Sequence, residues 1–262
     1  MDPANLRYHK PMSSESSGAA VPLRQPVARR VAFFGGSFDP PHLGHIAVAQ
    51  AAQRALNLDQ VLFAPVGLQP LKPTGSSASF EDRVAMTRLA IADHPGFSIS
   101  LLDAPSQEDG RTGTASPNYT VDTLARLRES LPQNTTLFLL LGADSFRTLH
   151  HWHHAAEIPF LASLIVASRP GEDLSNLSAL LPRGLELRPI SDEPNQYRLL
   201  NATGDRSSLT ILPDLNYDIS ATQLRTQLLT QLLAHVHGQS GAEPPLLSPA
   251  VLAYVLSHHL YA

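Results

Sequence analysis

The stretch FFGGSFDPPHLGH, residues 33–45, joins an apolar run to an alanine-rich segment through paired glycines and paired prolines. This order predicts a strand that ends at Gly35-Gly36, then a tight loop, then a helix that begins near His42. Glycine lets backbone N–H groups approach an anion without hindrance from a Cβ atom, and a helix N-terminus carries a partial positive charge. The stretch therefore predicts a phosphate-binding loop. It has neither the Gly-Lys-Ser/Thr of a Walker loop nor the Gly-x-Gly-x-x-Gly of a dinucleotide-binding loop.

His42 and His45 are three positions apart, so in the first turn of a helix both rings project from one face toward that loop. There, imidazoles can donate hydrogen bonds to phosphoryl oxygens. Two other interpretations stay open at this point: a pair of surface histidines, and a two-histidine metal site, for which the spacing supplies no third ligand. The phosphate role is modestly favoured.

Downstream of Val31, short β-branched or aromatic runs alternate with longer amphipathic stretches, which predicts βαβ units around a parallel sheet. Strands are expected at 31–35, 61–64, 97–102, 136–141, 162–167 and 209–212. Helices are expected at 43–57, 80–93, 120–130, 144–149, 155–159, 220–233 and 248–258. Ser79 with Asp82, and Ser220 with Gln223, have capping spacing at two of these helix starts. Segments 104–118, 171–206 and 238–245 are expected to be surface loops.

Composition excludes several classes of protein. The net charge is −4 and charged residues make up 16% of the chain, which argues against a general nucleic-acid binder. With no cysteine, disulfides, thiolate metal sites and cysteine nucleophiles are excluded. No apolar run approaches the roughly 20 residues of a membrane span. We expect a cytoplasmic protein that does not act at membranes, with a polar flexible leader over residues 1–29 and one domain over 30–262.

The string GGSFDPPHLGH resembles the motif of the nucleotidyltransferase superfamily named for its HxGH pattern, in the form found in bacterial nicotinate mononucleotide adenylyltransferases. Further segments resemble that family in the same order: Pro70-Leu71-Lys72, 118–124, Gly142 to Ser145 followed by Trp152, Ser168 to Gly171, and 219–225. The chain departs from the family at Leu71, where the family usually has His, and at Ala221, where it usually has Ser. The resemblance implies an α/β fold, a Rossmann-like doubly wound parallel sheet with C-terminal helices.

The resemblance also implies transfer of AMP from ATP to nicotinate mononucleotide, giving deamido-NAD and pyrophosphate, with Mg²⁺ bound through the ATP phosphates. A catalytic role is implied for His42, His45, Lys72 and Arg225. ATP binding is implied for Gly35, Gly36, Ser37, Phe38, Ser220 and Thr222. Contacts to the mononucleotide are implied for Thr120, Asp144, Trp152 and Arg169. No covalent intermediate is needed, because positioning and electrostatics suffice for such a transfer.

Several of these residues have structural alternatives. Lys72 is the only lysine after Lys10, against 17 arginines, and a compact mobile charge suits a phosphate clamp better than a decorative surface residue. Thr120 is expected to cap a helix as well as contact ligand. Trp152 either stacks on a flat cationic pyridinium or anchors a loop. The histidines around Trp152 invite a metal interpretation, which we hold to be the weaker one.

Other functions stay open on sequence alone. The acceptor of AMP could be nicotinamide mononucleotide, or the chain could be a non-catalytic nucleotide sensor on the same fold. A class I aminoacyl-tRNA synthetase would need a KMSKS-like loop, which this chain lacks. Retention of His42, His45, Lys72 and Arg225 together argues against a sensor, because binding alone does not need transition-state donors. The sequence leaves a homo-oligomer open.

Overall fold

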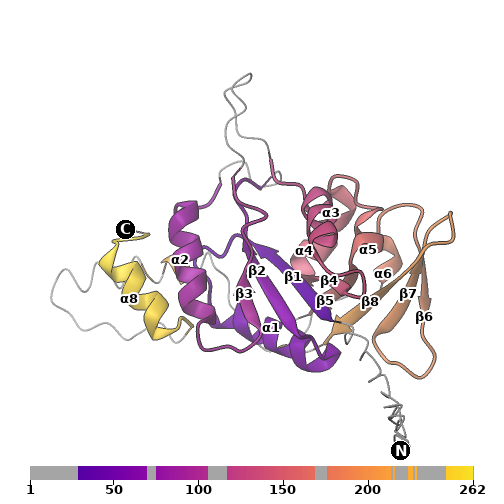
Figure 1. The fold of residues 1–262 in the computed structure, drawn as a ribbon, viewed down its shortest axis with the longest axis horizontal. Coiled ribbons are helices and arrows are strands. Elements are labelled where there is room, and N and C mark those ends of the chain that lie inside the picture. Colours follow the sequence, from indigo (N-terminus) through magenta and orange to yellow (C-terminus); the bar gives the residue numbers. More distant parts are fainter. Residues whose placement is uncertain are drawn as a thin grey trace, which may run out of the picture.

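The computed structural model describes residues 29–69, 75–105, 117–168, 176–213, 215, 224–226, 228 and 246–261. Strands and helices alternate along most of this part of the chain (Figure 1). The strands are β1 (Arg30–Gly36), β2 (Gln60–Pro65), β3 (Phe97–Ile99), β4 (Thr136–Gly142), β5 (Ser163–Ala167), β6 (Glu186–Pro189), β7 (Gln196–Leu200) and β8 (Arg206–Leu212). The helices are α1 (Leu43–Leu56), α2 (Phe80–Ile91), α3 (Thr120–Ser130), α4 (Ala143–Thr148), the 3₁₀ turn η1 (Leu149–His151), α5 (Ile158–Leu161), α6 (Leu177–Leu180) and α8 (Pro249–Ser257).

The strands form one sheet in the order β3-β2-β1-β4-β5-β8-β7-β6. Every pairing from β3 to β8 is parallel, whereas β7 pairs antiparallel with β8 and β6 antiparallel with β7. The chain leaves β1 toward β2 on one side and later returns to place β4 on the other side. This reversal of strand order makes the carboxyl ends of β1 and β4 the place where open α/β sheets bind ligands.

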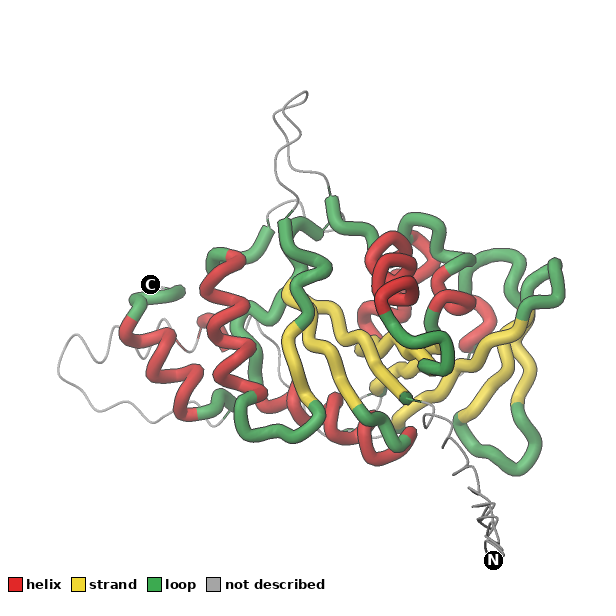
Figure 2. Tube along the Cα trace, in the orientation of Figure 1, coloured by secondary structure: helices red, strands yellow, loops and turns green. Residues whose placement is uncertain are grey.

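Both faces of the sheet are covered by helices (Figure 2). Along β1, Ala32 and Phe34 belong to a buried cluster shared with α1, α2 and α8, whereas Val31 and Phe33 belong to one shared with α3, α4, α5 and α6. This alternation explains why the strands are apolar on both faces, as a doubly covered parallel sheet requires. The predicted Rossmann-like doubly wound fold is confirmed.

One of the two predicted helix caps lies in the described residues. The backbone N–H of Asp82 donates to Oγ of Ser79 at 3.0 Å, and the Ser79 hydroxyl donates to a carboxylate oxygen of Asp82 at 2.7 Å. The cap fixes where α2 begins. The cap at Ser220 and most of the helix expected at 220–233 lie outside the described residues, although Leu224 and Leu228 are buried there.

The prediction of a surface loop over 171–206 is wrong. Part of that segment forms α6, β6 and β7, and the last two pair in register from Glu186 opposite Leu200 to Pro189 opposite Tyr197. These strands are short, and three of the four residues of β6 are exposed, so they lack the apolar runs that mark the central strands. The predicted loops at 104–118 and 238–245 lie wholly or mostly outside the described residues, as does the leader up to residue 28.

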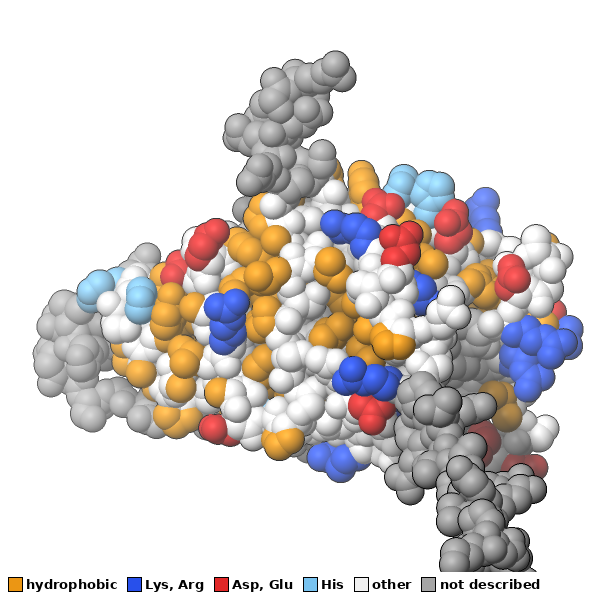
Figure 3. Space-filling model, in the orientation of Figure 1, with side chains coloured by type: hydrophobic (Ala, Val, Ile, Leu, Met, Phe, Trp, Pro, Cys, Tyr) orange, Lys and Arg blue, Asp and Glu red, His pale blue; other side chains and the backbone are white. Residues whose placement is uncertain are grey.

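Charged side chains of both signs are scattered over the face seen in Figure 3 and form no continuous basic patch there. Within the described ranges, no helix combines the length and the apolar character that crossing a bilayer requires.

Candidate active site

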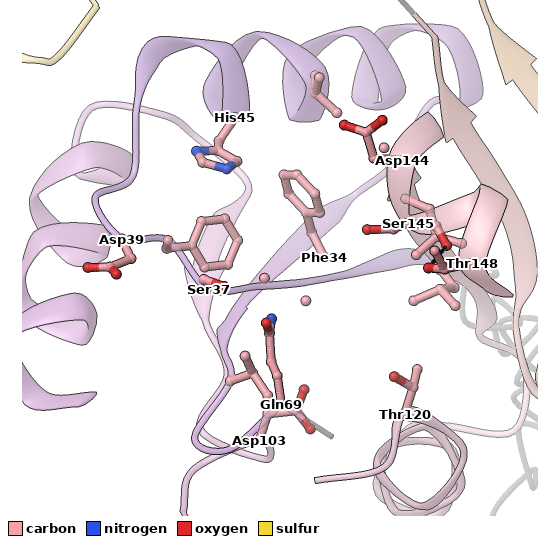
Figure 4. Close-up of a pocket in the computed structure, with 18 of the residues that line it drawn as sticks. Phe34, Ser37, Asp39, His45, Gln69, Asp103, Thr120, Asp144, Ser145 and Thr148 are labelled. Atoms are coloured by element: carbon pink, nitrogen blue, oxygen red, sulfur yellow. Dashed lines mark hydrogen bonds between the residues drawn. The ribbon is translucent and has the colours of Figure 1, made fainter. Parts of the chain in front are cut away.

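A cavity of about 1170 Å³ opens at the carboxyl ends of β1, β4 and β5. Its walls come from the loop after β1, the start of α1, the start of α3, the β4–α4 junction and the segment around Trp152. Figure 4 shows His45 and Asp144 at one end of the cavity, and Asp103 and Thr120 at the opposite end. Single small-molecule pockets are usually about 300–1,000 Å³, so this cavity has room for more than one ligand.

The loop after β1 is shaped by close contacts between its own residues. A Cβ atom at Gly36 would lie 3.2 Å from the ring of Phe38, closer than an ordinary van der Waals contact, so glycine lets the ring pack closely against the backbone there. Phe38 is buried and has φ of 48°, in the left-handed region that a bulky residue rarely adopts. The Asp39-Pro40 peptide bond is cis. A non-glycine residue held in this conformation beside a cavity marks a loop that its surroundings over-determine.

The two histidines stand at the start of α1, as the sequence predicted. His42 is the N-cap, and its backbone N–H donates to Nδ1 of His45 at 3.1 Å. The two rings stack with centroids 3.7 Å apart. Because Nδ1 of His45 accepts a hydrogen bond, the neutral ring carries its proton on Nε2, where it is a donor. Phe38 packs edge-on against the same ring, which holds its orientation.

Asp39 is 4% exposed and ties this loop to distant parts of the chain. Its carboxylate accepts hydrogen bonds from the backbone N–H groups of Ser77 at 2.6 Å and Ala78 at 3.1 Å. Its backbone carbonyl accepts one from Nη1 of Arg225 at 2.8 Å. The same guanidinium nitrogen lies 3.9 Å from the Asp39 carboxylate, so Arg225 is held beside the cavity by a residue of the loop.

Sequence reasoning missed Arg83, which is 2% exposed. From α2, its Nη1 donates to the carbonyl of Ser37 at 2.8 Å. Burial lowers the pKa of the Arg83 guanidinium, and the negative charge of Asp39 opposes that shift. The sequence analysis assigned Arg83 no role. The only available signal was its place in a helix whose other buried positions, apart from Thr87, are apolar.

Thr120, Asp144 and Trp152 all line the cavity. Thr120 is the first residue of α3 and Tyr119 is its N-cap, so the expected capping role of Thr120 is wrong. Asp144 is exposed and pairs with Arg147 at 3.2 Å. Trp152 is half-buried, and its Nε1–H donates to Oγ1 of Thr148 at 3.4 Å. That bond orients the indole at the cavity wall.

Sequence reasoning also missed Asp103, a buried carboxyl group that lines the cavity. Its Oδ1 accepts a short hydrogen bond from the hydroxyl of Thr123. Burial raises the pKa of Asp103, while the Thr123 bond and the positive charge of Arg126 act in the opposite direction. Asp103 lies in a segment rich in polar residues, where one carboxylate carries no pattern.

The structure thus brings ten of the predicted residues to one cavity: Gly35, Gly36, Ser37, Phe38, His42, His45, Thr120, Asp144, Trp152 and Arg225. Four others lie outside the described residues: Lys72, Arg169, Ser220 and Thr222. No three His, Asp or Glu side chains converge as metal ligands in the described part of the chain, the histidines around Trp152 included.

Comparisons with known proteins show which family the chain belongs to. A family model described as cytidylyltransferase-like matches residues 33–227. A relative from Herpetosiphon aurantiacus is 36% identical, over 89% of this chain and 98% of the relative. A relative from Gloeobacter violaceus is 35% identical, over 90% of this chain and 97% of the relative. Both are named "Probable nicotinate-nucleotide adenylyltransferase".

Among solved structures, the Plasmodium falciparum nicotinic acid mononucleotide adenylyltransferase complexed with NaAD aligns with a TM-score of 0.58 at 16% identity. The alignment covers 89% of this chain and 97% of that one, which supports the same fold. The chain belongs to the nicotinate-nucleotide adenylyltransferase family, a group of cytidylyltransferase-like nucleotidyltransferases.

Proposed function

We propose that the cavity holds ATP and nicotinate mononucleotide together and transfers AMP from the first to the second. The observation that carries this proposal is that one cavity of about 1170 Å³ is lined both by groups that suit phosphate and by an aromatic side chain. The glycine loop, the start of α1, His42 and His45 supply the first kind, and Trp152 supplies the second; Thr120 and Asp103 lie at the end opposite His45 (Figure 4). The relatives' names point to the same acceptor.

In the proposed reaction, a phosphate oxygen of nicotinate mononucleotide attacks the α-phosphorus of ATP. The new P–O bond forms as the bond from the α-phosphorus to the bridging oxygen breaks, and pyrophosphate leaves with that electron pair. Negative charge grows on the transferring phosphoryl group and on the leaving group. Stabilising that charge by preorganised donors is the main task of the protein.

Donors for that task come from the loop and from α1. We assign Nε2–H of His45 to the transferring phosphoryl group, and the backbone N–H groups of Gly35 to Phe38, with His42, to the neighbouring phosphates. Arg225, beside Asp39, suits the leaving pyrophosphate as a permanent positive charge. Lys72, Ser220 and Thr222 are proposed for the same triphosphate by family resemblance.

The acceptor's pyridine ring is assigned to the part of the cavity lined by Trp152 and the start of α3. Trp152 offers a flat π-surface for a flat cationic ring. Backbone N–H groups at the start of α3, after Tyr119, suit a nicotinate carboxylate better than a neutral amide, because the amide would bring its own N–H groups against donors. Arg169 and Asp144 are proposed as further contacts to this nucleotide.

Mg²⁺ is proposed to arrive with ATP. A small hard cation that prefers phosphate oxygens and water needs few protein ligands, and the described residues offer no carboxylate cage for it. When bound, it would neutralise charge on the triphosphate.

The test is pyrophosphate release by the purified chain with ATP, Mg²⁺ and each mononucleotide in turn. We expect kcat/KM for nicotinate mononucleotide to exceed that for nicotinamide mononucleotide by at least about tenfold, or about 1.4 kcal/mol. Equal values would reject the nicotinate preference but keep the adenylyl transfer. Absence of pyrophosphate with either acceptor would reject the transfer itself.

A further inference from the structure

The segment from Leu246 to Tyr261, which includes α8, reaches the loop after β1 at two separate points. The backbone N–H of Leu43, the first residue of α1, donates to the carbonyl of Leu246 at 2.8 Å. The phenol of Tyr261 donates to Oδ1 of Asp39 at 2.7 Å, across 222 positions of sequence. These contacts bracket the loop, one at each side of the cis Asp39-Pro40 bond and the His42 cap.

The contact made by Tyr261 falls on the carboxylate that organises the loop. Oδ1 of Asp39 also accepts from the N–H of Ala78, and Oδ2 accepts from the N–H of Ser77. Arg225 contacts the carbonyl of the same residue and lies 3.9 Å from Oδ2. The position of Asp39 therefore decides where the Arg225 guanidinium stands at the cavity wall.

The chain adopts unfavourable backbone conformations to make this contact. His259 has φ of 51° and Tyr261 has φ of 66°, both in the left-handed region although neither is glycine. Such residues persist where the surrounding structure over-determines them. Burial, and then the negative charge of Asp39, raise the pKa of the Tyr261 phenol well above its usual range, so it stays a protonated donor at every pH the enzyme would meet.

We propose that Tyr261 is a positioning residue for ATP: by holding Asp39, it keeps Arg225 directed at the triphosphate. Without the phenol, one oxygen of a buried carboxylate loses a donor. Arg83 also faces Asp39 but is held by the carbonyls of Ser37 and Ala78, whereas the guanidinium of Arg225, 3.9 Å from Oδ2, can move closer to compensate; a guanidinium drawn to Asp39 is less available to phosphate. This proposal rests on the proposed function, because it assigns Arg225 to ATP.

The second tyrosine of this segment supplies a matched control. The hydroxyl of Tyr254 donates to a carboxylate oxygen of Asp82 at 2.9 Å, so it also joins α8 to an acidic side chain. Asp82 belongs to the cap of α2 and does not line the cavity. Tyr261→Phe and Tyr254→Phe each remove one phenol–carboxylate hydrogen bond and keep the ring, but only the first removes it from the loop.

Both variants should be measured for steady-state kinetics, for binding of a non-hydrolysable ATP analogue by calorimetry, and for Tm. For Tyr261→Phe we expect KM for ATP and the analogue's Kd to rise about tenfold, with KM for nicotinate mononucleotide within about twofold of wild type. For Tyr254→Phe we expect both ATP values within about twofold of wild type. Tm should fall similarly in the two variants, by about 2–4 °C.

Two results would overturn the proposal: unchanged ATP values in Tyr261→Phe, whether or not its Tm falls, or the same rise of the ATP values in Tyr254→Phe. A different result would reject the proposed function: absence of pyrophosphate release by the wild-type protein. In that event the calorimetric comparison of the two variants still decides whether Tyr261 controls ATP binding.

Discussion

His45 owes its assigned role to one hydrogen bond. Because the N–H of His42 occupies Nδ1, the neutral ring offers its proton on Nε2 and cannot exchange the two roles without losing that bond. Phe34 and Phe38 lie against the ring with centroids 6.1 and 4.9 Å away, so it has apolar neighbours on the protein side. A donor fixed in this way needs no reorganisation when charge develops on the phosphoryl group.

Substitution of His45 by alanine is expected to lower kcat by about 100-fold or more, because the lost donor acts mainly in the transition state. Tm should change little, since the half-buried ring fills no closed core site. Steady-state kinetics and thermal melts, with His94→Ala as a histidine variant outside the cavity lining, provide the measurement. A variant within about threefold of wild type would show that His45 does not act on the transferring group.

The charged carboxylate of Asp103 is expected to lower the free energy of unfolding at neutral pH. Its pKa is raised by burial above the ordinary 3.8, so the unfolded chain gives up this proton at a lower pH than the folded chain does. Between the two pKa values the folded state holds more protons than the unfolded state, so the free energy of unfolding falls as pH rises through that range. Thr123 and Arg126 face the carboxyl group and limit the effect.

Asp103→Asn removes the buried charge and keeps a carbonyl oxygen for the Thr123 hydroxyl. The Tm of the variant should therefore match wild type near pH 4 and exceed it at pH 8, in melts without nucleotide at constant ionic strength. The difference between the two proteins cancels the other titrating groups. A variant that is less stable than wild type across the whole range would contradict this account.

These two residues show what kind of site residue a sequence reveals. His45 stands in a motif whose spacing, glycines and prolines all point to one geometry. Asp103 and Arg83 act through burial, and burial at a given polar position depends on which segments pack over it. No local pattern carries that information, so these two became visible only in the folded chain.

Helix α2 contacts the loop after β1 through the side chain of Arg83. Arg83 donates to the carbonyl of Ser37 and, at 3.4 Å, to that of Ala78, and its charge faces Asp39. Replacing Arg83 by methionine removes the donor to these two carbonyls and leaves the buried Asp39 carboxylate with Arg225 as its neighbouring guanidinium in the described residues. We expect a loss of about 3 kcal/mol in the free energy of unfolding, measured by urea denaturation.

Arg88→Met is the control for this helix, because Arg88 is exposed on the same α2. Its effect should stay within about 0.5 kcal/mol, as for ordinary surface changes. Similar losses from the two substitutions would mean that helix propensity, and not the buried contacts of Arg83, explains the result.

Elements were predictable where one period dominated. The central strands have both faces buried and are continuous apolar runs, and α1, α2 and α3 begin where the pattern predicts. The helix expected at 155–159 begins later, at Ile158, with Pro159 in its first turn where the missing N–H costs nothing. β6 and β7 were not predicted because ELRP and QYRLL mix charged and apolar residues. They are strands through their pairing: β7 pairs with β8, and β6 pairs with β7.

The eight strands of the described sheet lie between Arg30 and Leu212, so none of them contains a residue of the segment 1–28. We therefore expect a chain that lacks residues 1–28 to keep its activity within about twofold and its Tm within about 2 °C of the full chain. Pyrophosphate release and thermal melts on the two proteins test this expectation. A large loss in either would show that residues 1–28 contribute to the domain.

The two edge strands of the described sheet, β3 and β6, affect how readily copies of the molecule aggregate. A bare strand edge is a template on which another chain can add, and that is one route to aggregation. Here β3 offers three residues, and β6 carries Pro189, which has no N–H, beside the exposed pair Glu186 and Arg188, joined at 2.7 Å. The short edge strand β3 and the charged edge strand β6, which ends in proline, discourage strand addition. We therefore expect the enzyme to resist edge-to-edge aggregation at high concentration.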